Sequence, residues 1–196
     1  MKSKTLKNIL RPLKHALFGI DGIYKAMEEV GHADRIIDAG AGKGEYAEKF
    51  NRRFPLAKIH AFDPVQSGAG EVSSMVTIWD VALSDRSGRR KIWLDVDSLD
   101  GSSFHHDPEG RTHKEVDTME VDTTRIFRSG TIDLFKIDVE GHELEVLQGA
   151  TETLKNTRYA YIEISRNEWQ VLKFMHNAGF KLLWISEWNN YFFKKT

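Results

Sequence analysis

The chain has 196 residues, of which 28 are Lys or Arg and 29 are Asp or Glu, so its formal net charge is -1. This length suits one domain, since domains run to about 100–200 residues. A hydrophobic fraction of 40% supplies enough apolar material for a core and excludes a disordered chain. The near-neutral net charge differs from the strongly positive charge that is typical of nucleic-acid-binding domains. The lack of cysteine excludes disulfides, thiolate metal sites, iron–sulfur clusters and a cysteine nucleophile.

Residues 1–30 form a basic segment whose apolar side chains recur at helical spacing, at Leu6, Ile9, Leu10, Leu13 and Leu17. This pattern predicts an N-terminal helical segment that packs on the domain edge, covers a site as a lid, or contacts a membrane surface. Residues 31–196 are expected to form the main domain. The N-terminal apolar run is shorter than the about 7–15 residues of a secretory signal. No segment reaches the about 18 apolar residues of a membrane span, so we expect a cytoplasmic protein.

Strand and helix patterns alternate along the main domain. Short apolar runs predict strands at 35–38, 58–62, 76–83, 132–139 and 159–164. Helical patterns occupy 45–53, 144–154 and 167–177, and a closing hairpin is expected at 181–186 and 191–194. Alternating strands and helices indicate βαβ units, and therefore an α/β fold with a mostly parallel, doubly wound sheet.

A polar insertion at 89–120 interrupts this alternation. It contains probable strands at 91–96 and 114–121 around a histidine-containing loop. Because it joins the third strand to the fourth, we expect it near the carboxyl ends of the strands, where open α/β sheets bind ligands. The acidic and histidine side chains of the loop fit no helical metal-binding spacing and are interpreted as solvated, namely His105, His106, Asp107, Glu109 and His113.

A glycine-rich turn, Asp38-Ala-Gly-Ala-Gly-Lys-Gly44, follows the first strand and precedes a helix. The dinucleotide fingerprint needs glycine where Glu45 stands, and a P-loop needs Ser or Thr after its Gly-Lys pair. Glu45 at the helix start would also repel a pyrophosphate. The remaining match is to the loop that holds the amino-acid part of S-adenosylmethionine in class I methyltransferases. The residues assigned to it are Asp38, Gly40, Ala41, Gly42 and Gly44.

The second and third strands also end in polar residues. Asp63, followed by Pro64, ends the second strand 19 residues after Gly44. A carboxylate at this edge accepts ribose hydroxyls in related nucleotide folds, although an Asp-Pro turn is common by itself. The small and polar residues at the end of the third strand are expected to border an adenine, namely Ala82, Leu83, Ser84 and Asp85.

Charged residues interrupt the fourth strand. Because strand side chains alternate, Lys136, Asp138 and Glu140 should share one direction. Lys136 beside Asp138 supplies the partner that a buried charge needs and would keep Asp138 ionised. This pair is either structural or part of a site at the open end of the sheet. His142 opens the following helix, and Glu163 is another carboxylate inside an apolar strand.

The segment around this strand resembles the hallmark motif of the FkbM-type methyltransferases, a class I S-adenosylmethionine-dependent family. The motif, approximately K-I-D-V-E-G-x-E-x-x-V-L-x-G-A, matches at Lys136, Ile137, Asp138, Val139, Glu140, Gly141, Glu143, Val146, Leu147, Gly149 and Ala150. Supporting pieces follow in the family's order at 38–46, 62–64, 82–88, 101–103 and 162–164. The family often has Asn at Gly42 and Glu at Asp63, and both departures move toward the general class I pattern.

The resemblance implies a Rossmann-like class I methyltransferase fold with a seven-stranded sheet and a C-terminal antiparallel hairpin. It also implies O-methylation of a sugar or natural-product hydroxyl, so the expected partner is a small-molecule or glycan acceptor. We expect Asp138 or Glu140 to act as base or acceptor anchor, with His142 and Glu163 as second choices. Carboxylate oxygens also suit a divalent metal such as magnesium. The rival interpretations are a dinucleotide-dependent oxidoreductase and a non-catalytic S-adenosylmethionine-binding module.

Overall fold

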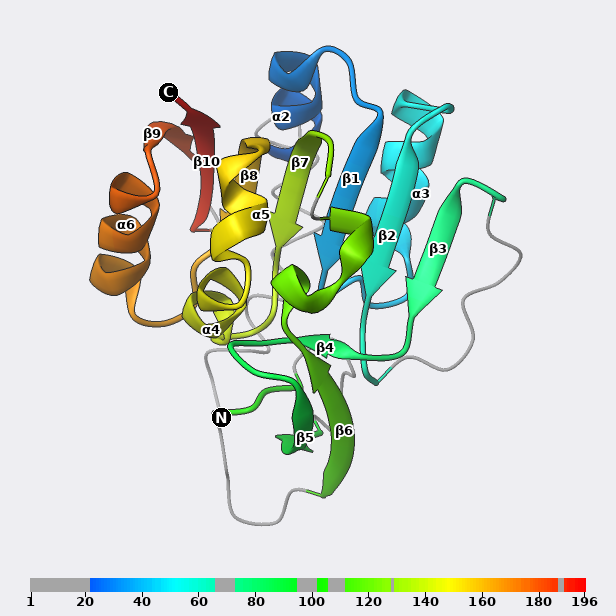
Figure 1. Cartoon of the computed structure of the whole chain (residues 1–196), viewed down its shortest axis with the longest axis vertical. Helices are drawn as coiled ribbons and strands as arrows, with labels where there is room; N and C mark the ends of the chain where they lie inside the picture. The colour runs from blue at the N-terminus through cyan, green and yellow to red at the C-terminus, as the bar shows by residue number, and fades with distance from the viewer. Residues whose placement is uncertain (1–21, 66–72, 95–101, 106–111, 128, 187–188) are drawn as a thin grey trace, which may run out of the picture.

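The computed structural model describes residues 22–65, 73–94, 102–105, 112–127, 129–186 and 189–196. A central sheet runs through these residues, with the order β3-β2-β1-β7-β8-β10-β9 (Figure 1). Its strands are β1 (Arg35–Ala39), β2 (Lys58–Phe62), β3 (Val76–Trp79), β7 (Ile132–Ile137), β8 (Thr157–Glu163), β9 (Phe180–Ile185) and β10 (Asn190–Lys195).

The sheet is mostly parallel. β3, β2, β1, β7 and β8 pair in parallel, whereas β10 pairs antiparallel with both β8 and β9. Every residue of β7 is buried, as expected for a central strand covered on both faces. The predicted α/β fold with a seven-stranded sheet and a C-terminal antiparallel hairpin is confirmed.

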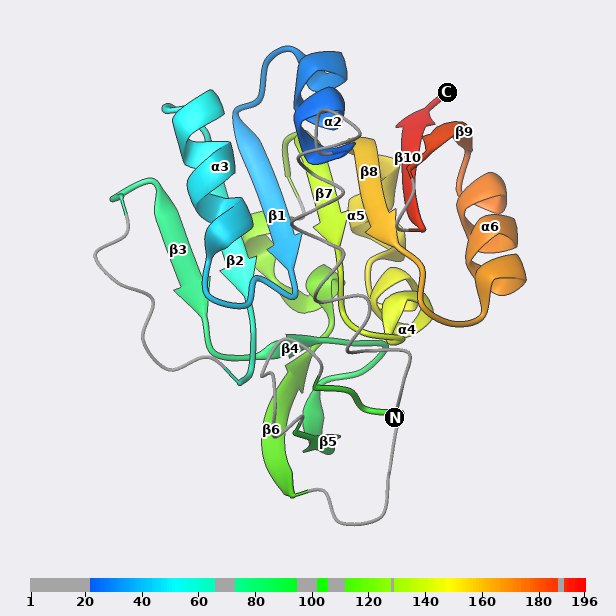
Figure 2. The ribbon, with the colours of Figure 1, turned by 180° about the vertical axis from the view of Figure 1, so that it is seen from behind.

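Helices cover both faces of the sheet (Figures 1 and 2). α2 (Gly22–Val30) and α3 (Glu45–Arg53) share one apolar cluster with one side of the sheet. α4 (Glu143–Gln148), α5 (Thr151–Lys155) and α6 (Glu168–Asn177) share a second cluster with the other side. This two-sided cover is the doubly wound arrangement that the alternating pattern predicts.

The helix α2 overlaps the end of the predicted N-terminal segment. It buries Ile23, Ala26, Met27 and Val30 in the same cluster as β1 and β2. The apolar series from Leu6 to Leu17 lies outside the described residues. Among the described residues, no helix is long and apolar enough to cross a membrane.

The predicted third strand at 76–83 was wrong, because it divides between two sheets. β3 ends at Trp79, and β4 (Ala82–Leu83) joins β5 (Gly88–Trp93) and β6 (His113–Met119) in a three-stranded sheet. Asp63 still donates its amide to Trp79, but the next amide on that side, Val65 N–H, donates to Asp63 Oδ1 instead. The parallel ladder therefore stops and the chain turns away.

The helix predicted at 144–154 was also wrong as one element, because α4 ends at Gln148 and α5 begins at Thr151. Gly149 between them lies against the loop after β4. A Cβ at Gly149 would lie 1.9 Å from the carbonyl oxygen of Ser84. This close backbone approach divides the helix and admits only glycine.

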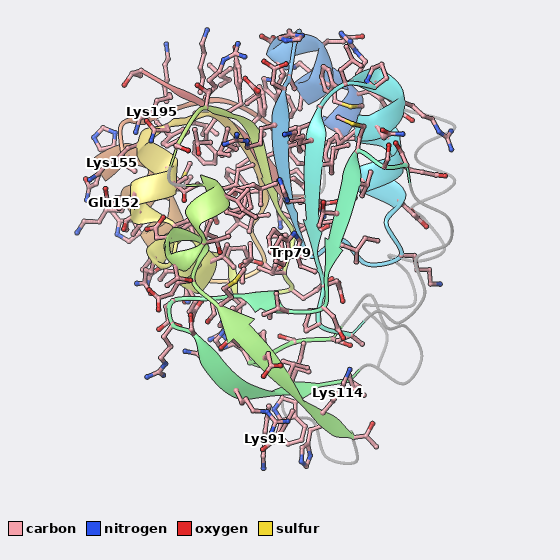
Figure 3. All side chains as sticks on the ribbon, turned by 45° about the vertical axis from the view of Figure 1, so that its right-hand side comes forward. Trp79, Lys91, Lys114, Glu152, Lys155 and Lys195 are labelled. Atoms are coloured by element: carbon pink, nitrogen blue, oxygen red, sulfur yellow. The ribbon has the colours of Figure 1, made fainter. Side chains whose placement is uncertain are left out.

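The small sheet lies beyond the carboxyl ends of β1, β2 and β3 (Figure 1), which confirms the expected position of the insertion. Lys114 extends from β6 (Figure 3) and its Nζ donates to the carbonyl oxygen of Pro64, 3.2 Å away. The two sheets are thus joined at the end of β2. Parts of the insertion, 95–101 and 106–111, lie outside the described residues.

Candidate active site

A cleft lies at the carboxyl ends of the central strands, between the two sheets. Most of the predicted site residues line it: Gly40, Ala41, Gly42, Asp63, Pro64, Ala82, Leu83, Asp138, Glu140, His142 and Glu163. The insertion contributes Ile92, Ser102 and Phe104 to its wall. Four of the predicted site residues are absent from this lining, namely Asp38, Gly44, Ser84 and Asp85.

The glycine turn is held by bonds to the end of β2. The amides of Gly40 and Ala41 both donate to the carbonyl oxygen of Phe62, at 2.9 and 3.0 Å. Gly40 has φ +74°, and a Cβ there would lie 1.7 Å from the carbonyl oxygen of Asp138. Glycine is therefore required where the ends of β1 and β7 meet.

Asp38 stabilises this turn from behind the cleft. Its side chain is fully buried, and its Oδ1 lies 2.9 Å from Lys136 Nζ. Lys136 also donates to the carbonyl oxygen of Gly40 at 2.8 Å and lies 3.7 Å from Asp138 Oδ2. The nearer partner of Lys136 is thus Asp38, which the alternation of a single strand could not reveal.

Lys136 and Asp38 each stabilise the charged form of the other. Burial by itself lowers the pKa of Lys136, but the carboxylates of Asp38 and Asp138 outweigh it and hold the pKa above its ordinary value. Burial raises the pKa of Asp38, and the charge of Lys136 opposes that rise. The pair ties β1 to β7 directly beneath the cleft.

Asp63 ends β2 and faces the cleft. Its Oδ2 accepts the amide of Gly42 at 3.0 Å, and its Oδ1 accepts the amide of Val65 at 2.9 Å. A carboxylate has about four acceptor sites, and hydroxyl donors of a ligand are suitable partners for such a group. Both interpretations of Asp63, as a local turn residue and as a ligand acceptor, fit this geometry.

Ser84 and Asp85 lie behind the part of the wall formed by Ala82 and Leu83. Ser84 is fully buried, and its hydroxyl lies 2.9 Å from His142 Nε2 and 3.0 Å from Asp85 Oδ1. Asp85 in turn pairs with Arg90 of β5 at 2.5 Å. Neither residue lines the cleft, and their contacts join the end of β4 to His142 and to β5.

The chain leaves β7 through a strained turn. Asp138, Val139 and Glu140 follow the strand and line the cleft. Glu140 has φ +50°, an unusual value for a residue with a side chain, and Gly141 has φ +99°. The Ser103 hydroxyl donates to the carbonyl oxygen of Glu140 at 2.7 Å. Backbone strain of this kind is typical of functional sites.

His142 lies at the start of α4 and is 1% exposed. Its Nε2 contacts the Ser84 hydroxyl, and its Nδ1 lies 3.0 Å from His105 Nε2. Burial, together with the nearby charges of His105 and Arg90, lowers the pKa of His142 to about 3. A base works best with a pKa near the working pH, so this neutral, fully engaged ring is poorly suited to accept a proton.

His105 is an exposed residue, as the interpretation of a solvated loop expects, but its ring also contacts the start of α4 through His142. Its Nε2 also lies 3.5 Å from Glu145 Oε1, and a quarter of its side chain is exposed. His113 lies on β6 with its ring against Trp93. His106, Asp107 and Glu109 lie outside the described residues. Only the tertiary structure brings His105 next to α4.

Glu143 is a buried carboxyl group that was assigned no role from the sequence beyond the motif. It is 1% exposed, and its Oε1 accepts the amide of Gly141 at 2.7 Å. Burial raises the pKa of Glu143 to about 7, against the effect of the amide bonds. Its place two residues after Gly141 in the motif is the signal for this role in holding the turn.

The cleft carries an acidic surface. Among the described residues that line it, the carboxyl side chains are Glu45, Asp63, Asp138, Glu140 and Glu163, and the lysine is Lys43. Such a surface attracts a cationic ligand and repels a pyrophosphate.

Comparison with known proteins agrees with this geometry. The sequence matches the Methyltransferase FkbM domain family over residues 38–182. The 2-O-methyltransferase NoeI of Sinorhizobium fredii is 29% identical over 157 residues, which cover 68% of this chain. The chain spans 64% of that relative's length.

A solved structure shares the fold. The methyltransferase FkbM of Methylobacillus flagellatus superposes with a TM-score of 0.52 at 14% identity, covering 83% of this chain and 43% of that protein. The family match extends from the buried Asp38 through the motif at the end of β7 to Leu182 in the hairpin. The chain therefore belongs to the FkbM methyltransferase family.

Proposed function

We propose that this protein is an S-adenosylmethionine-dependent O-methyltransferase that acts on a hydroxyl group of a sugar or natural product. The acidic cleft at the carboxyl ends of β1, β2 and β7 is the observation that carries the proposal. The family match supports methyl transfer, and the name of the relative NoeI, a 2-O-methyltransferase, supports oxygen as the acceptor atom.

The chain's own residues account for the binding of each part of the cofactor. When bound, S-adenosylmethionine supplies an electrophilic methyl group. The turn at Gly40, Ala41 and Gly42 borders the methionine part, and Glu45 offers a carboxylate to its ammonium group. Asp63, at the end of β2, accepts the ribose hydroxyls with its carboxylate oxygens. The small side chain of Ala82 and the apolar side chain of Leu83 form the wall for the adenine.

Asp138 is our choice for the group that accepts or orients the acceptor hydroxyl. It follows β7 directly, lines the cleft, and has 23% of its side chain exposed. Glu140 and Glu163 line the same cleft and are the alternatives. His142 is a weaker choice because both ring nitrogens are engaged. Since methyl transfer is a direct displacement, alignment of the acceptor supplies most of the rate.

The first experiment is a calorimetric titration with S-adenosylhomocysteine, with NAD as the control ligand. We expect saturable binding of S-adenosylhomocysteine and none of NAD. Asp63→Asn should weaken the binding by about 10- to 100-fold, since a hydrogen bond to a charged group contributes about 1.5–3 kcal/mol. Asp34→Asn is the matched control, because Asp34 precedes β1 at the opposite edge and is 80% exposed. Tight NAD binding without S-adenosylhomocysteine binding would favour an oxidoreductase.

The second experiment measures transfer of a labelled methyl group to a panel of sugar and natural-product hydroxyls. Asp138→Asn should lower turnover much more than it lowers cofactor affinity. Full activity of Asp138→Asn would remove the base assignment. Normal cofactor affinity of the unmodified chain without turnover on any acceptor would instead favour the non-catalytic binding module.

A further inference from the structure

We propose that His105, His142 and Glu145 form a binding site for one divalent transition-metal ion such as Zn²⁺, beside the cleft. His105 belongs to the insertion between β5 and β6, His142 immediately precedes α4, and Glu145 lies in its first turn. The ligand atoms offered by the three side chains lie within 4.8 Å of one another. The site uses none of the cleft carboxylates and stands independently of the methyl transfer proposed above.

The distances between the ligand atoms suit tetrahedral coordination. Metal–ligand bonds of about 2.0–2.2 Å in tetrahedral geometry separate neighbouring ligand atoms by about 3.4 Å. His105 Nε2 lies 3.0 Å from His142 Nδ1 and 3.5 Å from Glu145 Oε1. His142 Nδ1 lies 3.7 Å from Glu145 Oε2. The two Glu145 distances end at different oxygens of the carboxylate, so this group would bind the ion through both oxygens or rotate to bring one of them into place.

The surroundings of His142 prepare one nitrogen for the metal. The Ser84 hydroxyl donates to Asp85 Oδ1 and thus presents its oxygen to His142 Nε2, 2.9 Å away. This arrangement favours the tautomer with hydrogen on Nε2, which leaves the lone pair of Nδ1 directed at the cluster. Metal-binding histidines are typically oriented in this way by an outer partner.

Glu145 supplies the negative charge of the site. Its Oε2 is buried and has no hydrogen-bond partner among the described residues, which is costly for a carboxylate unless a cation compensates it. Arg90 and Arg166 also place positive charge near the histidines, but Arg90 is paired with Asp85. Two imidazoles and one carboxylate suit Zn²⁺ and disfavour Mg²⁺, which prefers oxygen ligands.

A bound ion would fix one wall of the cleft. The segment 102–105 places Phe104 in that wall, with its ring centroid 4.5 Å from that of His142. Ser103 and Glu140 already join this segment to the turn after β7. Coordination of His105 would add a second link, directly to α4, and so hold Phe104 in position.

The test is a titration of tag-free, chelator-treated full chain with Zn²⁺ in competition with a chromophoric chelator. We expect one Zn²⁺ per chain, no competition by Mg²⁺, and a higher unfolding temperature with Zn²⁺ present. Co²⁺ should give the visible absorption of a tetrahedral site. No stoichiometric Zn²⁺ binding by the folded chain would overturn the proposal.

Variants assign the site to these residues. His105→Gln and Glu145→Gln should abolish stoichiometric binding and the Co²⁺ absorption, and both replace partly exposed side chains, so the fold should persist. Ser84→Ala should weaken Zn²⁺ binding by about 10- to 100-fold. His176→Ala is the matched control, because His176 is an exposed histidine on α6. Equal losses in His105→Gln and His176→Ala would overturn the assignment, and circular dichroism checks that each variant is folded.

Discussion

The buried pair of Lys136 and Asp38 is expected to be a large contributor to stability. Lys136→Met keeps a side chain of similar length but removes the charge between β1 and β7. The change breaks the 2.9 Å contact with Asp38 and the 2.8 Å bond to the carbonyl oxygen of Gly40. It leaves Asp38, which is 0% exposed, without its cation. Removing one partner of a buried ion pair costs about 3–5 kcal/mol.

Protonation of Asp38 limits this cost. Neutralising a carboxyl group whose ordinary pKa is 3.8 costs about 4 kcal/mol at pH 7 and less than about 2 kcal/mol at pH 5. In the Lys136→Met variant, burial raises the pKa of Asp38 further because the charge of Lys136 no longer opposes it. A carboxyl group with a raised pKa favours the folded state at low pH, where it is protonated, and this contribution is lost as the pH rises. The loss of unfolding free energy in Lys136→Met should therefore grow from about 2 kcal/mol at pH 5 to about 4 kcal/mol at pH 7.

Urea unfolding of the unmodified chain, Lys136→Met and the double variant Asp38→Asn with Lys136→Met measures these free energies. The double variant should recover much of the loss, because it removes both charges from the buried position. A loss below about 1 kcal/mol at pH 7, or a double variant no more stable than Lys136→Met, would refute the reasoning.

Two further predictions concern the turns beside the cleft. Gly40→Ala should cost about 2–5 kcal/mol of unfolding free energy, because its Cβ would meet the Asp138 carbonyl at a positive φ. Gly44→Ala, whose Cβ would meet no atom of the described residues within 4 Å, should cost only about 1–2 kcal/mol, and equal losses in urea unfolding would contradict this. Burial raises the pKa of Glu143 to about 7, so its contribution to stability is full below about pH 4.5 and is lost as pH rises through 7. Glu143→Gln should remove about 3 kcal/mol of this pH dependence, and unchanged slopes in urea unfolding at pH 5 to 8 would contradict it.

Most of the central sheet could be predicted from local patterns. β2 coincides with the predicted strand at 58–62, and α3 with the predicted helix at 45–53. Such elements are set by side-chain periodicity within one segment. The failures have non-local causes. The third strand stops at Trp79 because Asp63 binds the Val65 amide, and the helix after β7 divides because Gly149 lies against Ser84.

The candidate site shows the same division. The order of the motifs placed Gly40, Asp63 and Asp138 at the carboxyl edge, because parallel strands separated by helices must all end there. The contacts that support the edge come from segments far apart in the chain. Ser84 binds His142 across 58 positions, and Lys136 binds Gly40 across 96. A linear pattern carries no information about such pairs.

The sequence by itself determined the α/β class, the mostly parallel character of the sheet and the family, because these follow from periodicity and from one specific motif at the end of β7. The tertiary structure alone decided which charges face the cleft and which lie behind it. Asp38 and Ser84 lie buried behind the cleft, and the ring of the exposed His105 contacts His142 at the start of α4. The physical reason is that pairing of buried charges and close backbone approach are satisfied between segments, after the elements have packed.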